Sequence, residues 1–306
     1  MTNSLRVAVI GGSGTGAIRE LVSRLPERSG IAFLIAIPDQ AELGALLRPV
    51  SKLAVIDAAE AVQLEPDRIY VVPAGRDVTL RRSALQVSSP TTPVAQLDRL
   101  LRSVAEEIGR ASTAVILEGT GTDGAIGLKR IKEAGGVALA QVASDGELGE
   151  MPRAAIATGL VDLVVEIGDL AQRMCTLTAA PEDPLDDEPA HVSEPAIDSL
   201  QDILALVRAR SGHDFSAYKR ATLYRRVARR VHVCQCASTA AYCLYLRDHP
   251  TELAHLLRDF LISVTNFFRD PDAYRVLATD VLPQLFAGKT AADQIRVWVA
   301  GCATGE

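Results

Sequence analysis

The sequence predicts an α/β protein: a doubly wound, mostly parallel sheet, followed by an all-α helical domain and the first strand of a further α/β domain. Two observations support this prediction. Short apolar runs alternate with helical patterns from residue 5 to about residue 179, and beyond an acidic stretch rich in proline the patterns are helical. The strands expected in the first part are 6–10, 32–37, 68–72, 113–117, 137–141 and 163–167. The helices expected between them are 17–25, 94–109, 125–134 and 152–158, and a small hairpin is expected from 78–80 and 84–87.

The second half begins after a predicted linker. Residues 180–195 combine four prolines with acidic residues and have almost nothing to bury. After this linker we expect helices at 197–211, 215–233, 239–248, 251–262 and 271–286. Residues 294–300 predict a strand, and Gly301 and Gly305 after it are typical of the opening of a nucleotide-type βα unit. We therefore expect this last domain to be cut short at residue 306.

Composition and charge narrow the class of protein. The 306 residues suffice for about two domains, and 48% hydrophobic with 23% charged residues is ordinary for a globular protein. A net charge of −6 argues against a general nucleic-acid binder. No apolar run is long enough to span a bilayer and no signal-like segment opens the chain, so we expect a cytoplasmic protein without membrane insertion. The five cysteines are odd in number, and the spacing of His232, Cys234 and Cys236 is unlike a zinc motif; we expect reduced thiols and no metal site.

The glycine-rich turn at residues 11–16, after the first expected strand, is compatible with several functions. Such a turn places its tip, Ser13, over the carboxyl edge of the sheet, where open α/β folds bind ligands. Ser13 could be a nucleophile on a strained elbow, with backbone N–H groups facing an oxyanion. The pattern from Gly12 to Ala17 could instead hold a dinucleotide pyrophosphate, with Asp39 on a ribose hydroxyl. A third hypothesis is that the glycines only let helix and strand pack closely, and the turn alone does not decide among the three.

Three further stretches resemble the catalytic domain of the chemotaxis receptor methylesterases, CheB-type. In the family's order they are ILEGTGTDG at 116–124 with EAGG at 133–136, ALAQ at 138–141, and MPRAAIATGLVD at 151–162. The resemblance covers about residues 5–178 and implies a methylesterase-like fold. It also implies a catalytic triad in which Ser13 is the nucleophile and Asp123 is the acid. The family's histidine, which follows the second strand, has no counterpart here.

The missing histidine changes the expected activity. No histidine precedes His191 in the sequence. A serine hydroxyl is a weak nucleophile until a neighbouring base takes its proton, so we expect little or no esterase activity. The glycines around Ser13 also depart from the family, which has alanine before its serine and two glycines after it. A rival hypothesis is that Asp39 or His191 supplies the base, although a carboxylate of ordinary pKa is a poor base at neutral pH.

The second half, from about residue 197, resembles the receptor glutamate methyltransferases, CheR-type. The matching stretches, in the family's order, are GHDFSAYKR at 212–220, LYRRVARR at 223–230, ISVTNFFRD at 262–270 and VWVAGCATGE at 297–306. The resemblance implies that a basic helix bearing Lys219, Arg226 and Arg229 docks on the acidic methylation helices of chemotaxis receptors. For the same residues, a solvated basic helix face is the alternative.

The same resemblance implies S-adenosylmethionine as the methyl donor of a full-length parent. Thr265 and Arg269 match positions that hold the donor, and Glu306 lies near the position whose acid contacts it. Ser263 stands where many relatives have asparagine. We do not expect residues 1–306 to bind the donor, since the strands that carry its other contacts are not in this chain.

The leading hypothesis is a chemosensory receptor adaptation protein that fuses the two resemblances. The family chemistry is hydrolysis of protein-glutamate methyl esters and methyl transfer to receptor glutamates. The alternatives are a non-catalytic receptor-docking or regulatory module and, third, a dinucleotide-dependent oxidoreductase. The expected domains are a methylesterase-like domain at 1–179, a linker at 180–196, a receptor-docking helical domain at 197–270, and the start of a methyltransferase domain at 271–306.

Overall fold

The chain contains two compact units. The structure, a computed structural model, describes residues 5–37, 40, 42–58, 61–90, 95–143, 146–178, 194–261, 271–290 and 293–300. Residues 1–262 form the first unit and residues 263–306 form the second. None of the described helices is both long enough and apolar enough to cross a membrane.

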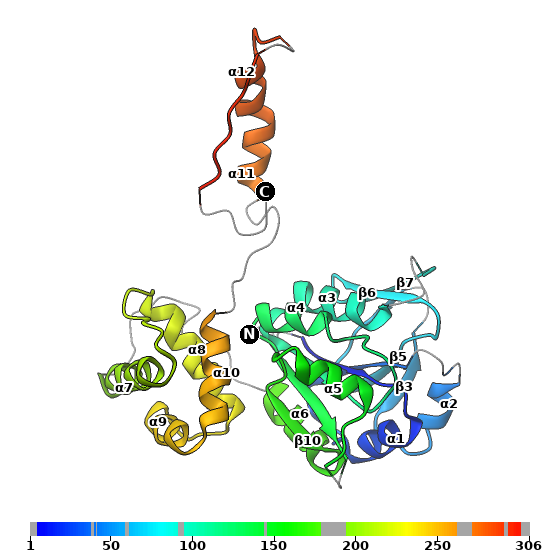
Figure 1. Cartoon of the computed structure of the whole chain (residues 1–306). Helices are drawn as coiled ribbons and strands as arrows, with labels where there is room; N and C mark the ends of the chain where they lie inside the picture. The colour runs from blue at the N-terminus through cyan, green and yellow to red at the C-terminus, as the bar shows by residue number, and fades with distance from the viewer. Residues whose placement is uncertain are drawn as a thin grey trace. The chain divides into compact units, whose positions relative to one another are not determined.

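A seven-stranded sheet forms the centre of the first unit (Figure 1). Its strand order is β10-β9-β8-β1-β2-β5-β3, and every pairing in it is parallel. The chain moves outward from β1 to one side through β2 and to the other through β8, so the strand order reverses at β1 and β8. In open α/β sheets, ligands bind in the crevice at such a switch point, outside the carboxyl ends of the strands. The strands are β1 (Arg6–Gly11), β2 (Ile31–Ala36), β3 (Ala54–Asp57), β5 (Arg68–Val71), β8 (Ser112–Ile116), β9 (Val137–Val142) and β10 (Leu163–Glu166).

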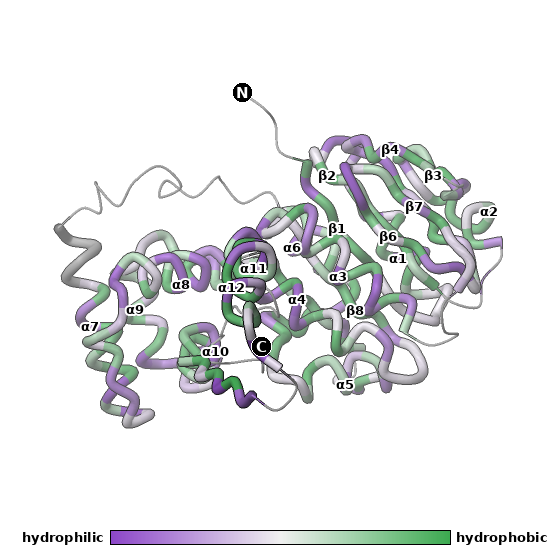
Figure 2. The backbone as a smooth tube through the Cα atoms, turned by 90° about the horizontal axis from the view of Figure 1, so that it is seen from above, coloured by the Kyte–Doolittle hydropathy of each residue, from purple (hydrophilic) through white to green (hydrophobic). Residues whose placement is uncertain are grey.

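Helices cover both faces of this sheet because its central strands are apolar on both sides. In β1, Val7 and Val9 belong to the apolar cluster under α3, α4 and α5, whereas Ala8 and Ile10 belong to the cluster under α1, α2 and α6. This two-residue alternation follows from strand geometry. Figure 2 shows the central strands as mostly hydrophobic tubes between helices of mixed hydropathy. The helices are α1 (Thr15–Arg24), α2 (Leu43–Leu47), α3 (Gln96–Ile108), α4 (Gly127–Glu133), α5 (Glu150–Ala157) and α6 (Ile167–Thr178).

A second, three-stranded antiparallel sheet has the order β4-β7-β6 and contains the expected hairpin. The prediction of a doubly wound parallel sheet is confirmed, and each strand expected before residue 168 is present within a few residues. The pattern missed β3 and α2, which are only four and five residues long. It also missed α6, which follows β10 without an intervening turn residue. The elements of this part not yet named are β4 (Ala61–Gln63), β6 (Asp77–Arg81), β7 (Ala84–Ser88) and the short helix η1 (Gly109–Ala111).

Four helices after the expected linker pack around a core of their own. They are α7 (Glu194–Ser211), α8 (Arg220–Val233), α9 (Thr239–Asp248) and α10 (Pro250–Leu261). Helix α8 begins five residues later than expected because residues 214–218 form turns. Asp214 accepts the backbone N–H of Ser216, and Phe215 is buried in the helical core. Of the expected linker, residues 180–193 lie outside the described residues, and residues 194–196 belong to α7.

The described part of the second unit contains one helical stretch, made of α11 (Pro271–Val276), the π-helical η2 (Leu277–Val281) and α12 (Leu282–Phe286). This agrees with the helix expected at 271–286. The strand expected at 294–300 is not formed, and Val297 and Trp298 are 76% and 91% exposed. A strand needs a hydrogen-bonded neighbour, and no described residue pairs with this segment.

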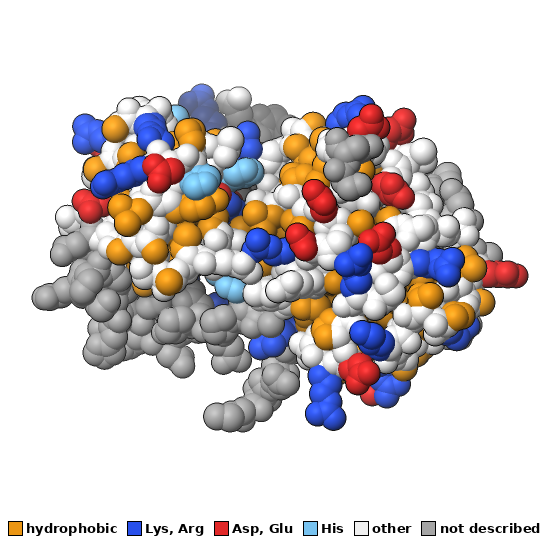
Figure 3. All heavy atoms as spheres, turned by 90° about the horizontal axis from the view of Figure 1, so that it is seen from below, with side chains coloured by type: hydrophobic (Ala, Val, Ile, Leu, Met, Phe, Trp, Pro, Cys, Tyr) orange, Lys and Arg blue, Asp and Glu red, His pale blue; other side chains and the backbone are white. Residues whose placement is uncertain are grey.

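One face of the molecule carries charges of both signs. On the face shown in Figure 3, Lys and Arg side chains are interspersed with Asp and Glu side chains. No single field of charge covers this face.

Candidate active site at the carboxyl ends of β1 and β8

Ser13 lies in the turn between β1 and α1, at the switch point of the sheet. Its hydroxyl oxygen accepts a hydrogen bond of 3.0 Å from the backbone N–H of Thr120, in the loop that follows β8. The two loops thus meet where the fold predicts a ligand site. As the sequence predicted, Ser13 is at the tip of the elbow.

The backbone N–H groups at this tip already have a partner. Those of Ser13 and Gly14 both donate to the carbonyl oxygen of Glu118, over 3.0 and 3.4 Å. A pyrophosphate at a glycine-rich turn is held by free N–H groups of this kind. In this arrangement neither N–H group is available to a phosphate or to an oxyanion. This occupancy argues against the dinucleotide hypothesis. It also leaves the N–H of Thr120 as the donor beside the serine oxygen.

The loop after β8 is held by hydrogen bonds from two other elements. The side chain of Gln141, on β9, accepts the N–H of Glu118 over 2.9 Å, and Glu150, at the start of α5, accepts the N–H of Gly121 over 2.9 Å. Gly119 is tightly enclosed, because a Cβ there would lie 2.8 Å from the Ser13 hydroxyl oxygen. Gln141 belongs to the stretch at 138–141 that resembles the methylesterases, but the sequence gave no indication that its side chain holds the loop after β8.

Asp123 caps the N-terminus of α3. Its two carboxylate oxygens accept the backbone N–H groups of Leu97 and Asp98, each over 3.0 Å. The residue before α3, Ala95, is left-handed at φ 71° and has no side chain that could do this. Burial raises the pKa of the neighbouring Asp98, and the charge of Asp123 raises it further, whereas the hydrogen bond from the Gly127 N–H lowers it. Both oxygens of the expected triad acid are therefore engaged in holding a helix.

Ser13 and Asp123, the two residues that the resemblance assigned to a triad, line one pocket. Among its described lining residues, Arg76 and Asp123 are the only ionisable side chains, so no imidazole lies there. The two residues considered as substitute bases, Asp39 and His191, lie outside the described residues. Sequence reasoning missed Arg76 and Gln96 because no motif contains them. The pocket is lined by Gly12, Ser13, Ala36, Ile37, Val72, Pro73, Arg76, Val78, Gln96, Leu97, Leu100, Thr120, Asp123 and Met151.

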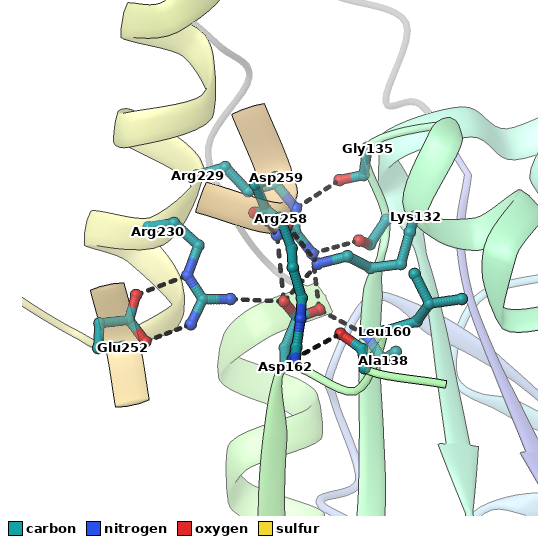
Figure 4. Close-up of polar contacts among 12 residues, drawn as sticks. Lys132, Gly135, Ala138, Leu160, Asp162, Arg229, Arg230, Glu252, Arg258 and Asp259 are labelled. Atoms are coloured by element: carbon teal, nitrogen blue, oxygen red, sulfur yellow. Dashed lines mark hydrogen bonds and ion pairs between the residues drawn. The ribbon is translucent and has the colours of Figure 1, made fainter. Parts of the chain in front are cut away.

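The basic residues predicted to meet a receptor do not form one free face. Lys219, just before α8, is exposed, whereas Arg226 is half-buried. The side chain of Arg229 is only 12% exposed and forms ion pairs with Asp162 and Asp259, both over 2.6 Å (Figure 4). The residues predicted to hold the methyl donor, Ser263, Thr265, Arg269 and Glu306, lie outside the described residues.

Two of the described cysteines, Cys175 and Cys234, have raised thiol pKa values. Burial raises the pKa of Cys175 to about 11, with a further contribution from Asp67. Burial and the charge of Glu252 raise the pKa of Cys234 to about 12. Both thiols are therefore protonated and weakly nucleophilic at neutral pH. Within the described ranges, no group of three or more His, Cys, Asp or Glu side chains could hold a metal ion.

The fold and the site together define an α/β protein with a hydrolase-type serine elbow beside an aspartate-bearing loop. The family described as CheB methylesterase matches residues 8–174, and the CheR methyltransferase all-alpha domain matches residues 198–261. The chain belongs to the CheB methylesterase family and carries a CheR-type all-α domain after it, so the predicted fusion is confirmed.

Three similar proteins illustrate this relationship. A Rhodobacter capsulatus protein, "Uncharacterized 104.1 kDa protein in hypE 3'region", is 35% identical over 288 residues, which are 86% of this chain and 30% of that protein. A "Protein-glutamate methylesterase/protein-glutamine glutaminase" from Moorella thermoacetica is 35% identical over 188 residues, covering 56% of this chain and 44% of that one. The crystal structure of the Thermotoga maritima CheB methylesterase catalytic domain superposes with a TM-score of 0.51 at 24% identity, covering 57% of this chain and 99% of that one, which shows the shared fold. The chain spans less than half the length of these two curated relatives.

Proposed function

We propose that this chain is a chemosensory adaptation protein whose methylesterase-like domain has lost hydrolytic activity and whose helical domain docks on receptors. One observation supports the loss: Ser13 and Asp123 share a pocket whose described lining contains no imidazole. The family supplies the proposed substrate class, the glutamate methyl esters of chemotaxis receptors. A cytoplasmic location belongs to the same proposal.

The missing base explains why the pocket would not hydrolyse an ester. A serine hydroxyl attacks a carbonyl only when a neighbouring group takes its proton, and loss of that base in a serine triad costs about 10⁶ in kcat. Here the serine oxygen faces the N–H of Thr120, a donor that cannot accept a proton. Asp123 is turned toward the backbone of α3. The pocket holds the serine and the aspartate that an esterase would use, without the imidazole that would start the reaction.

Methanol release from a methylated receptor tests this proposal. The chain and its Ser13→Ala variant should release methanol at the same background rate. Added imidazole, a small base that could enter the pocket, should then accelerate the chain with Ser13 and leave the variant unchanged. Methanol release that depends on Ser13 in imidazole-free buffer would contradict the proposed loss of activity.

The helical domain suggests a second role, in which docking is separate from catalysis. Lys219, Arg220 and Arg225 are exposed at the start of α8 and could meet an acidic helix.

The CheR-type domain implies S-adenosylmethionine in full-length relatives. We propose no tight donor binding by residues 1–306, because the segment at 293–300 does not form the strand that would position a donor-binding turn. Calorimetric titration with S-adenosylmethionine tests this, and tight binding would contradict it.

A further inference from the structure

A buried cluster of six ionisable side chains joins the esterase-like domain to the helical domain (Figure 4). Lys132 lies on α4 and Asp162 directly before β10, both in the esterase-like domain. Arg229 and Arg230 lie on α8, and Glu252 and Asp259 lie on α10. The ion pairs of the cluster are Lys132 with Asp162 and Asp259, Arg229 with Asp162 and Asp259, and Arg230 with Asp162 and Glu252.

Asp162 is the centre of this cluster. Its carboxylate pairs with Lys132 over 2.5 Å and with both Arg229 and Arg230 over 2.6 Å. It also accepts the backbone N–H of Ala138 over 2.9 Å. Two of its three cationic partners therefore come from the helical domain, so this carboxylate bridges the two domains.

The charges in the cluster compensate one another. Arg230 donates Nε and Nη2 to the two oxygens of Glu252 over 2.7 and 2.5 Å, and Tyr242 donates its hydroxyl to the same carboxylate. Three cations thus face three anions. A buried charge without a partner is costly, so each of these groups favours the arrangement that pairs all six.

Contacts without charge hold the same two surfaces together. Val233, the last residue of α8, is 1% exposed and packs into the apolar cluster of the esterase-like domain beneath α1 and α6. Arg229 donates to the carbonyl of Gly136 over 2.7 Å. Arg173, on α6, donates to the side chain of Gln235. The ion cluster is therefore part of a packed contact and not an isolated surface pair.

This contact divides the basic residues around α8 into two groups. Lys219, Arg220 and Arg225 remain exposed, whereas Arg229 and Arg230 are covered and already paired with carboxylates. We propose that the esterase-like domain is an intramolecular cover for the basic face of α8, so that closure over Asp162 and docking of an acidic partner helix exclude each other. This inference rests on the proposed receptor docking and adds its regulation.

Two substitutions open the contact without touching the basic residues of α8. Val233→Asp places a charge in the apolar cluster, and Arg173→Ala removes the bond to Gln235. Both changes make the protein more negative, so neither can favour an acidic ligand through charge alone. Arg24→Ala is the matched control, since Arg24 is exposed on α1 and donates to Gly168 within the esterase-like domain.

The test measures opening and binding separately on the full chain. Hydrogen exchange of residues 229–236 reports opening, and fluorescence anisotropy with a labelled, glutamate-rich helical peptide reports docking. If the closed form holds about nine-tenths of the molecules, opening should tighten peptide binding about tenfold. We expect faster exchange and tighter binding in Val233→Asp and Arg173→Ala, with Arg24→Ala like the parent.

Each other outcome overturns one specific part of the proposal. Faster exchange with unchanged affinity would show that the contact covers nothing that the peptide needs. Unchanged exchange in both variants would show that the contact does not hold the domains together in solution. Absence of peptide binding by the parent and by every variant would overturn the receptor-docking function itself, whatever the exchange data show.

Discussion

The backbone N–H of Thr120 lies 3.0 Å from the hydroxyl oxygen of Ser13 and donates a hydrogen bond to it. This bond joins the elbow after β1 to the loop after β8, which also bears Asp123. Two loops separated by 107 positions in sequence are thereby locked together at the switch point of the sheet. The contact leaves so little space that a side chain at the neighbouring residue, Gly119, would force its surroundings to shift.

Gly119→Ala should destabilise the protein. The added Cβ would lie 2.8 Å from both the backbone nitrogen and the hydroxyl oxygen of Ser13, so the elbow must move. Overpacking of this kind costs about 1–3 kcal/mol. Gly16→Ala is the control, because Gly16 is exposed on α1 with nothing within 4 Å, and alanine there should stabilise by about 0.5–1 kcal/mol. Urea unfolding checks both, and a Gly119→Ala variant as stable as the parent would contradict the enclosed site.

Asp123→Ala should destabilise through α3, whether or not the pocket is catalytic. The substitution leaves the N–H groups of Leu97 and Asp98 without their acceptor, and loss of a helix cap costs about 0.5–2 kcal/mol. Glu106→Ala, on the exposed side of the same helix, should change stability little. Thermal melting measures the difference. Equal melting temperatures for the parent and Asp123→Ala would mean that the cap contributes nothing to stability.

Charge reversal at two arginines of α8 should have different effects. Arg225 is exposed, so Arg225→Glu should weaken binding of an acidic helical peptide, more at low salt than at high salt, without lowering stability. Arg229→Glu puts a third carboxylate beside Asp162 and Asp259 and should destabilise by about 3–5 kcal/mol. Anisotropy and urea unfolding separate the two effects. If Arg229→Glu weakened peptide binding at unchanged stability, Arg229 would be a surface docking residue.

Acid should lower the free energy of unfolding of the protein through the ion cluster. Burial alone would raise the pKa of Asp162, but Arg229, Lys132 and Arg230 hold it well below the ordinary 3.8, and the pKa of Asp259 is lowered as well. A carboxyl whose pKa is depressed in the folded state adds stability above its unfolded pKa, and this stability is lost as the pH falls through the folded value. The contribution of Asp162 should therefore be constant between pH 7 and pH 5 and decline below pH 3.8. The urea midpoint of the Asp162→Asn variant should fall less steeply with decreasing pH below 3.8 than the midpoint of the parent. Parallel curves of midpoint against pH for the two proteins would contradict a lowered pKa for Asp162.

Most of the first domain could be predicted because its determinants are local. The apolar run of β1 and the glycines after it specify a buried parallel strand that turns into a helix, and the structure has both. The sequence indicated Ser13 and Asp123 as candidate site residues because they stand in recognisable motifs, and both line one pocket. The capping of α3 by Asp123 was not foreseen, because acceptor and donors are separated by about 25 residues and no pattern connects them.

The amino-acid order alone determined which residues share a strand, a helix face or a loop, since these follow from the two-residue and 3.6-residue periods of the backbone. It indicated a basic helix and the loss of a histidine, and both are properties of single segments. Only the tertiary structure decided what covers that helix: Asp162 is 67 positions before Arg229 in the sequence, yet its carboxylate accepts hydrogen bonds from the guanidinium of Arg229. Likewise the segment at 294–300 has the composition of a strand, yet whether a strand forms depends on a hydrogen-bonding neighbour, which a one-dimensional pattern does not contain.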